Sequence, residues 1–227
     1  MISWRSAGNE GAQEKLAGLP RRDIHIEGDE RMKTIAIDID DTINNFGEVL
    51  AGLKLDHKDY SYIDAERFDE YVDIVKRGRA SDGENIPYIG RFLLDVHRRC
   101  FKEAKARLDA IKFVNWLKDN NWRIIVLTYR DLRGAEDITK EWLRENGISY
   151  DYIFSSDNKP LFCKLWGIDH LIDDTMVNLI LAPQYGVNTY YPINVNNRDY
   201  PEVVKGEVKA IGFNDYSELY SKFEVMI

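Results

Sequence analysis

Residues 34–42 have the sequence Thr-Ile-Ala-Ile-Asp-Ile-Asp-Asp-Thr, which is the strongest fold signal in the chain. Its first four residues are apolar or β-branched, as in a strand that is buried on both faces. Aspartates then appear from Asp38 onward, as they do where such a strand ends in a loop. The pattern predicts a buried parallel strand with a polar loop at its carboxyl end.

Further runs of the same kind follow along the chain, the last of them weaker. They cover residues 123–128, 152–154, 170–173, 187–191 and 208–213. Helical patterns lie between them, at 107–119, 134–146 and 160–166. Strands that alternate with helices of this length form βαβ units, whose parallel sheet is covered by helices on both faces. The predicted fold class is therefore α/β, with a Rossmann-like parallel sheet.

The stretch 45–105 interrupts this alternation. It is charged and rich in Tyr and Phe, and its helical patterns lie around 46–55, 64–77 and 90–105. We expect a small helical cap inserted after the first strand, which leaves 32–44 and 106–227 as the α/β core. Residues 1–31 are polar, contain several Gly and lack a sustained period, so they are predicted to be a flexible leader before a working domain that begins at Met32.

The charge balance limits the classes of partner. The chain has 31 Lys and Arg against 39 Asp and Glu, a formal charge of -8, which disfavours binding to a nucleic-acid polymer or an anionic membrane. A phosphorylated substrate would also be repelled, so a metal ion or a basic side chain must reverse the field inside the site. The sequence contains no Gly-rich phosphate loop, which disfavours an ATP-dependent kinase or a dinucleotide enzyme.

Cysteine usage and hydropathy bear on location. Cys100 and Cys163 lie in helical patterns and not at the spacing of a disulfide framework or a metal knuckle. No apolar run approaches the roughly 20 residues that span a bilayer, and no apolar signal-peptide stretch begins the chain. We expect a soluble cytoplasmic protein, and the oligomeric state stays open.

Polar residues follow three of the expected strands. The three clusters are Asp38-Ile39-Asp40-Asp41-Thr42, Thr128-Tyr129-Arg130 and Asp173-Asp174-Thr175. Ligands bind beyond the carboxyl ends of parallel strands, so these clusters are expected to meet in one crevice. Asp and Thr in such places can also simply cap the following helices. Three clusters in order on alternating strands, together with a lysine, favour a functional site over capping.

Crowded carboxylates need a compensating cation. Asp38 and Asp40, at i and i+2 on a strand end, can face one crevice while Ile39 packs the other way. Two such charges 4 Å apart repel each other by roughly 4 kcal/mol at an effective dielectric constant of 20. Asp173 and Asp174 would raise that cost if they converge on the same place. An all-oxygen set of ligands suits octahedral Mg²⁺.

The stretch IAIDIDDT resembles the first motif of the haloacid-dehalogenase-like (HAD-like) hydrolase superfamily, an apolar strand followed by Asp-x-Asp-x-Thr. The resemblance covers residues 33–223. It implies a magnesium-dependent phosphatase with a covalent aspartyl-phosphate intermediate. Asp38 would be the nucleophile, and Asp40 would protonate the leaving oxygen and then activate water.

The same resemblance implies roles for residues on the later strand ends. Thr128 would bind a phosphoryl oxygen, and Lys159 would neutralise charge in the transition state. The metal ligands would be Asp173 or Asp174, the Asp38 carboxylate and the Asp40 carbonyl. Lys159 begins a helix in Asn-Lys-Pro, where the proline is tolerated; Lys164, nearer the acidic pair in sequence, is the competing lysine.

The insert corresponds in this superfamily to a cap that closes over the crevice, excludes water and contacts the leaving group. Candidate cap contacts to the substrate are Phe46, Tyr60, Tyr62, Phe68, Tyr71, Tyr88 and Arg91. Most aromatics at helical spacing are core residues, so each is a candidate only. Thr42, Tyr129, Arg130 and Lys164 are substrate-binding candidates on the core side.

The stretches IDIDDTINNF, LTYRD, HLIDDT and YGVNTYYPINVNNRDYPE look like the 5'(3')-deoxyribonucleotidase-like branch of the superfamily (5' nucleotidase, C type). That branch implies a cap that stacks on a nucleobase and an Asn as in Asn196-Asn197-Arg198. Tyr129 departs from the branch, which often has a small residue there. The leading hypothesis is a phosphatase of (deoxy)nucleoside monophosphates. The alternatives are a phosphatase of sugar phosphates or other small phosphomonoesters, and a binding protein that keeps the fold without turnover.

Overall fold

The structure is a computed structural model, and it describes residues 32–77, 86–194, 197 and 210–226. The leader expected at 1–31 lies outside the described residues, as do Asn196 and Arg198. The described part from Met32 onward forms one compact unit.

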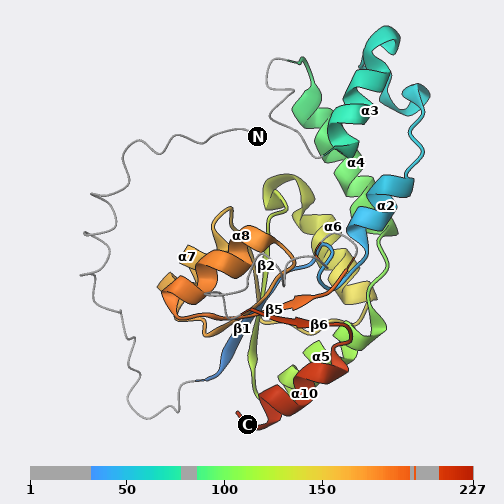
Figure 1. Cartoon of the computed structure of the whole chain (residues 1–227). Helices are drawn as coiled ribbons and strands as arrows, with labels where there is room; N and C mark the ends of the chain where they lie inside the picture. The colour runs from blue at the N-terminus through green and yellow to red at the C-terminus, as the bar shows by residue number, and fades with distance from the viewer. Residues whose placement is uncertain (1–31, 78–85, 195–196, 198–209, 227) are drawn as a thin grey trace, which may run out of the picture. The chain divides into compact units, whose positions relative to one another are not determined.

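Six strands form one sheet, with the order β3-β2-β1-β4-β5-β6 (Figure 1). The strands are β1 (Thr34–Ile37), β2 (Arg123–Thr128), β3 (Tyr152–Ser155), β4 (His170–Ile172), β5 (Asn188–Pro192) and β6 (Ile211–Phe213). Every neighbouring pair is parallel, which confirms the predicted α/β fold. The register places Ile37 beside both Val126 and Ile172. The strands that carry the three polar clusters are therefore adjacent, and they end at the same edge of the sheet.

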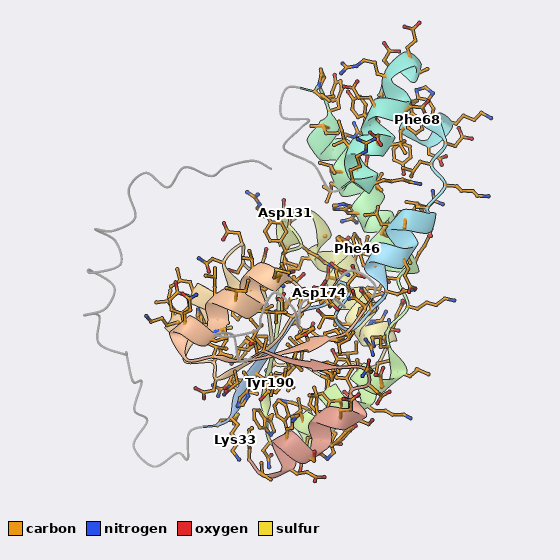
Figure 2. The ribbon with its side chains drawn as sticks, in the orientation of Figure 1. Lys33, Phe46, Phe68, Asp131, Asp174 and Tyr190 are labelled. Carbon is orange, nitrogen blue, oxygen red and sulfur yellow. The ribbon has the colours of Figure 1, made fainter. Side chains whose placement is uncertain are left out.

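The inner strands β1, β2 and β4 are buried on both faces, which explains why their sequences are almost continuously apolar, whereas the edge strands β3 and β6 are partly exposed. Successive side chains point to opposite faces, so Ile35 and Ile37 belong to one core cluster and Ala36 to another. Helices α5 (Leu108–Asp119) and α10 (Ser217–Glu224) contribute to the first cluster, and α7 (Lys159–Trp166) contributes to the second. Figure 1 shows these helices on opposite sides of the sheet, and in Figure 2 the labelled Tyr190 marks a sheet residue of the first cluster.

All three predicted helices of the core are present: α5, α6 (Leu132–Glu145) and α7. Their ends differ from the predicted ones by at most two residues. Two helices were not predicted, α8 (Met176–Leu181) and α10. Helix α8 has only six residues, so the sequence offers little periodic signal there. Helix α10 has eight residues, as many as the predicted α7, so its length does not explain why it was missed. A 3-10 turn, η4 (Ala182–Tyr185), continues α8.

The interruption after β1 is helical, as expected. It contains α2 (Phe46–Gly52), two 3-10 turns η1 (His57–Tyr60) and η2 (Ala65–Arg67), α3 (Phe68–Lys76) and α4 (Ile89–Glu103). These helices share a cluster of buried side chains that includes Phe68, which is labelled in Figure 2. The residue bounds 45–105 for a separate cap remain a prediction.

The two chain segments that connect β1 and α5 to this helical insert are bonded to each other. Asn44 and Ala106 form an antiparallel bridge, and the Arg107 amide donates to the Ile43 carbonyl at 2.9 Å. The Lys105 amide donates to the side-chain oxygen of Asn45 at 2.8 Å. The entry and the exit of the insert therefore start from one fixed place beside the Asp38–Thr42 loop.

Within the described residues, no helix has both the length and the apolar character that crossing a membrane requires.

Candidate active site

Asp38 is the first residue beyond β1, and the sheet fixes its backbone. Its amide donates to the Ile172 carbonyl of β4 at 2.9 Å, so the residue continues the ladder by one position. The side chain is buried, with 5% of the residue exposed. Its Oδ1 lies 2.8 Å from Nζ of Lys159. A buried carboxylate is thus held at the carboxyl edge of the central strand and is paired with one cation.

Lys159 reaches the site from the first position of α7. The side chain of Asn158 caps this helix by accepting from the Leu161 amide at 3.1 Å. The Lys159 ammonium also donates to Asp173 Oδ2 at 2.7 Å, so it bridges two carboxylates. Lys164 is exposed on the same helix, and its ammonium lies 4.9 Å from the centre of the Tyr185 ring. Of the two competing lysines, Lys159 is therefore the one whose ammonium contacts the carboxylates of Asp38 and Asp173.

Asp173 follows β4 and is fully buried. Its Oδ1 accepts from the Thr175 amide at 2.9 Å and from the Asn178 amide side chain at 3.0 Å. With Lys159 on Oδ2, both of its oxygens are engaged by protein donors. Asn178, on the unpredicted helix α8, is a site residue that sequence reasoning missed, because its only signal was a polar residue in a short apolar run.

Carboxylate oxygens of Asp38, Asp173 and Asp174 lie within 4.8 Å of one another. Oxygen donors at this spacing fit a hard divalent cation such as Mg²⁺. Asp174 is only half-buried and lies beside the two fully buried acids. The site therefore has the donor set for the predicted metal.

The acids raise one another's pKa, and the lysine opposes this. Burial, then the nearby Asp173 and Asp40, raise the pKa of Asp38 to about 7, although Lys159 lowers it. Burial, then Asp38, Asp173 and Asp41, raise the pKa of Asp174 to about 8. Burial alone would lower the pKa of Lys159, but Asp38 and Asp173 outweigh it, so that pKa is raised and the ammonium stays charged. The cluster carries more negative charge than one lysine neutralises, which favours binding of a further cation.

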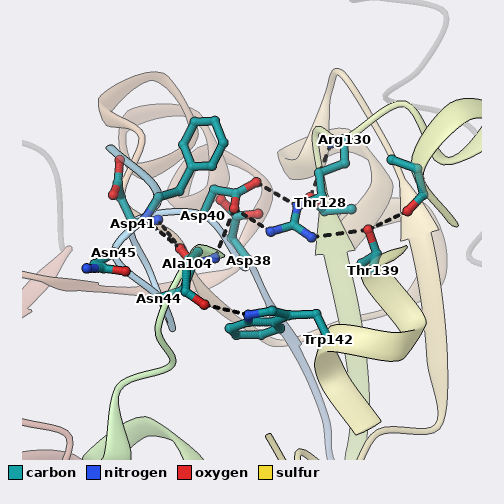
Figure 3. A network of polar contacts seen from close by, with 12 residues as sticks. Asp38, Asp40, Asp41, Asn44, Asn45, Ala104, Thr128, Arg130, Thr139 and Trp142 are labelled. Carbon is teal, nitrogen blue, oxygen red and sulfur yellow. Dashed lines mark hydrogen bonds and ion pairs between the residues drawn. The ribbon is translucent and has the colours of Figure 1, made fainter. Parts of the chain in front are cut away.

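Asp40 has a different partner (Figure 3). Nε of Arg130 donates to Asp40 Oδ2 at 2.8 Å, and Nη2 donates to Oδ1 at 2.6 Å. The side-chain amide of Asn44 adds a third bond, to Oδ1, at 3.0 Å. Asp40 therefore has a fixed carboxylate plane, while 22% of its side chain remains exposed.

Arg130 is anchored from behind. Its side chain is 1% exposed, and its Nη1 donates to Thr139 Oγ1 of α6 at 3.1 Å. Its guanidinium carbon lies 3.8 Å from the centre of the Phe101 ring of α4. Thr139 and Phe101 were not identified from the sequence, because each acts through a contact between distant segments. Asn44 was also missed, although its bond to Asp40 spans only four residues.

The remaining core-side candidates lie on the same loops. Thr128 is buried, and its Oγ1 accepts from the Arg130 amide at 3.2 Å. Thr42 is buried, and its hydroxyl has no hydrogen-bond partner among the described residues. Tyr129 is 73% exposed. Their predicted contacts with a substrate stay predictions.

The candidate substrate contacts of the insert differ in burial. Phe46 is half-buried, and its ring centre lies 5.4 Å from that of Phe101. It therefore packs against the same ring that the Arg130 guanidinium contacts. Tyr60, Phe68 and Tyr71 are buried in the insert's own cluster, as core residues are. The others named from the sequence are less buried: Tyr88 and Arg91 are exposed, and the Arg91 guanidinium lies 4.0 Å from the centre of the half-buried Tyr62 ring.

Asn197 is buried, and it bonds the Asn194 amide at 2.7 Å and the Pro192 carbonyl at 2.8 Å. These contacts attach Asn197 to the end of β5.

The fold is that of the HAD-like hydrolases. The structure resembles a HAD-like family hydrolase, SP0104, from Streptococcus pneumoniae, with a TM-score of 0.55 and 16% identity over 85% of this chain and 98% of that chain. It also resembles the HAD-hydrolase YfnB from Bacillus subtilis bound to magnesium, with a TM-score of 0.55 and 19% identity over 86% of this chain and 100% of that chain.

A third similar structure is D,D-heptose 1,7-bisphosphate phosphatase from Burkholderia thailandensis, with a TM-score of 0.51 and 10% identity over 85% of this chain and 98% of that chain. No protein-family model matches the sequence, and no curated protein matches it. At these identities the likeness establishes the fold, and the chemistry has to be argued from the residues.

Proposed function

We propose that the protein is a magnesium-dependent phosphomonoester hydrolase that acts through an aspartyl-phosphate on Asp38. One observation carries the proposal: Lys159 bridges Asp38 and Asp173 at 2.8 and 2.7 Å, with Asp174 beside them. This is a nucleophile, a cation and a set of metal ligands at one edge of a parallel sheet. A fold shared with phosphatases agrees with it but does not carry it.

The first step transfers the phosphoryl group to the enzyme. A carboxylate oxygen of Asp38 attacks phosphorus while the bond from phosphorus to the leaving oxygen breaks. Asp40, in its protonated form, gives that oxygen its proton. Lys159 lies on the attacking carboxylate and offsets the negative charge that the phosphoryl group brings.

The second step returns the enzyme to its starting state. A water oxygen attacks the phosphorus of the aspartyl-phosphate, and Asp40, now ionised, takes the proton of that water. The bond from phosphorus to Asp38 breaks, so phosphate leaves and the Asp38 carboxylate is restored. The sum is one phosphomonoester and one water converted into one alcohol and one phosphate.

The metal ligands can be assigned among the candidates. Asp173 already accepts three protein hydrogen bonds, so its function is to hold Lys159. Asp38 and Asp174, with the backbone carbonyl of Asp40, would hold Mg²⁺. When bound, Mg²⁺ would offset the charge of the acids and of the phosphoryl oxygens.

The substrate is proposed to be a (deoxy)nucleoside monophosphate. The motifs IDIDDTINNF, LTYRD and HLIDDT support this proposal. The half-buried Phe46 also supports it, because it packs against Phe101, the ring that Arg130 contacts, and offers an aromatic face for a base. A sugar phosphate or another small phosphomonoester is the alternative. Nucleic-acid polymers and membranes are disfavoured as partners by the charge of -8.

A reducing, cytoplasmic location is also proposed. Cys100 and Cys163 are both unpaired and buried. Burial raises the pKa of Cys100 to about 11 and that of Cys163 to about 12, so neither thiol is reactive at neutral pH.

The test is release of inorganic phosphate from a panel of nucleoside monophosphates, sugar phosphates and p-nitrophenyl phosphate, with and without Mg²⁺. Asp38→Asn should lower kcat by roughly 10⁴-fold or more while the protein stays folded, because the nucleophile is removed. Asp119→Asn is the matched control: it is an exposed aspartate at the end of α5, and it should retain full activity.

The outcomes separate the hypotheses. A preference for sugar phosphates over every nucleotide would remove the nucleotide proposal and keep the chemistry. Activity that survives in Asp38→Asn would remove the proposed nucleophile. A folded wild-type protein that binds phosphate compounds but hydrolyses none of them would favour the binding protein without turnover.

A further inference from the structure

We propose that Arg130 is a positioning residue, which fixes the plane of the Asp40 carboxylate relative to the leaving oxygen and keeps one lone pair of Asp40 Oδ2 available. This inference rests on the proposed phosphatase function. It gives Arg130 a role other than the substrate contact expected from its place beside Thr128.

The geometry of the pair is a fork. Two guanidinium nitrogens of Arg130 meet the two oxygens of Asp40 at 2.8 and 2.6 Å (Figure 3). Such bidentate pairing sets the plane of a carboxylate, which a single point charge cannot do. A proton donor that must reach a leaving oxygen needs its lone pairs aimed in one direction, so a fixed plane contributes to the rate.

The bonds on Asp40 are not symmetric. Oδ1 accepts from both Arg130 and Asn44, whereas Oδ2 accepts from Arg130 alone among the described residues. Each carboxylate oxygen has two lone-pair sites, so Oδ1 is saturated and Oδ2 keeps one site. Oδ2 is therefore the oxygen of Asp40 that can form a further hydrogen bond with the leaving oxygen.

The guanidinium has no comparable freedom. It is buried, its third nitrogen bonds Thr139, and the Phe101 ring covers one face. Thr139 in turn donates to the Ala135 carbonyl within α6 at 2.7 Å. These contacts fix Arg130 to the core. Arg130 is buried, whereas part of the Asp40 side chain is exposed to solvent. This difference favours an action of Arg130 through Asp40 over a direct contact with phosphate.

The experiment uses leaving groups of different basicity. Loss of a general acid hurts a poor leaving group, such as the alcohol of a nucleoside monophosphate, far more than p-nitrophenolate, which leaves without a proton. Arg130→Lys keeps a positive charge but removes the fork. In single turnovers, we expect the rate of the first step to fall roughly 10²-fold for the nucleotide and less than about tenfold for p-nitrophenyl phosphate.

A double-mutant cycle adds a second criterion. In an Asp40→Asn background, Arg130→Lys should cause little further loss, because a residue that acts through Asp40 has nothing left to orient. Losses that multiply in the double variant would overturn the proposal. So would an equal loss for both leaving groups, or a raised KM with unchanged kcat, which would mean that Arg130 binds the substrate.

A gentler variant covers the case in which Arg130→Lys does not fold. Thr139→Val removes the hydroxyl behind Arg130 and keeps the pair with Asp40. It should show the same dependence on leaving group at a loss of about fivefold, and a uniform loss would again overturn the proposal. The two proposals are contradicted by different results. Wild-type protein that hydrolyses no substrate would contradict the phosphatase function itself. Active wild-type protein whose Arg130 and Thr139 variants lose the same activity for both leaving groups would contradict only the role of Arg130.

Discussion

Asp38 and Asp40 lie two positions apart on one loop, yet they are paired with cations of different kinds. Lys159 meets one oxygen of Asp38 and shares itself with Asp173, whereas Arg130 meets both oxygens of Asp40. An ammonium is a compact charge on a flexible stem, and a guanidinium is a planar fork. The nucleophile thus has a cation that leaves an oxygen free to attack, and the proposed acid has one that fixes its direction.

The surroundings of the two pairs differ in the same sense. Lys159 and its two acids are almost fully buried, with side-chain exposures of 3%, 7% and 0%. The Asp40 side chain is partly exposed to solvent, whereas Arg130 is buried against Thr139 and Phe101. One pair concentrates charge for the phosphoryl group and for a metal, and the other holds a proton carrier in place.

The largest effect is expected from breaking the first pair. Lys159→Met should lower kcat by roughly 10³-fold, because the charge on the attacking carboxylate and the phosphoryl group is no longer offset. It should also destabilise the fold by about 3 kcal/mol without metal, since Asp38 and Asp173 lose their cation. Enzyme kinetics and denaturant unfolding measure the two effects.

Lys159→Arg tests whether the positive charge alone is sufficient, because it keeps the charge but brings a larger, planar group into a buried space. We expect it to restore less than about a tenth of the lost activity. Full activity in Lys159→Arg would contradict the view that the two cations have different functions.

An intermediate effect is expected on the metal. Asp174→Asn should weaken Mg²⁺ binding roughly 10²-fold, because a charged ligand becomes a neutral one. Calorimetric titration with Mg²⁺ in the absence of substrate measures this directly. At saturating Mg²⁺ the ratio of nucleotide to p-nitrophenyl phosphate turnover should stay that of wild type, since the Arg130 pair is untouched; a changed ratio would show that the two pairs are not independent.

The smallest effect is expected at the aromatic ring behind Arg130. Phe101→Leu keeps an apolar side chain but removes the ring 3.8 Å from the guanidinium. A loss of about 1 to 2 kcal/mol in stability follows from the lost cation–π contact and packing. Thermal unfolding gives the stability, and the leaving-group ratio should shift by only a few-fold; no shift at all would mean that Thr139 alone holds Arg130.

The fold could be predicted largely from the sequence, because its cause is local. An apolar β-branched run such as 34–37 with aspartates after it predicts a buried parallel strand wherever the rest of the chain goes. The helices α5 and α6 have enough turns for a periodic signal, whereas the six residues of α8 do not. Helix α7 has eight residues, and its start is marked in the sequence by Asn158-Lys159-Pro160. The insert's helices were predicted as helical, but the C-terminal end of each was placed one to three residues too far along the chain.

The order of residues along the chain already indicates which acids stand at the strand ends, since parallel strands end at one edge and polar residues after them share it. The partners of these acids come from the packing of the fold: Lys159 and not Lys164 contacts Asp38, Asn178 bonds Asp173, and Arg130 turns inward to Asp40. Spacing along a strand or helix sets which way a side chain faces, but a hydrogen bond between residues 90 positions apart depends on how those elements pack.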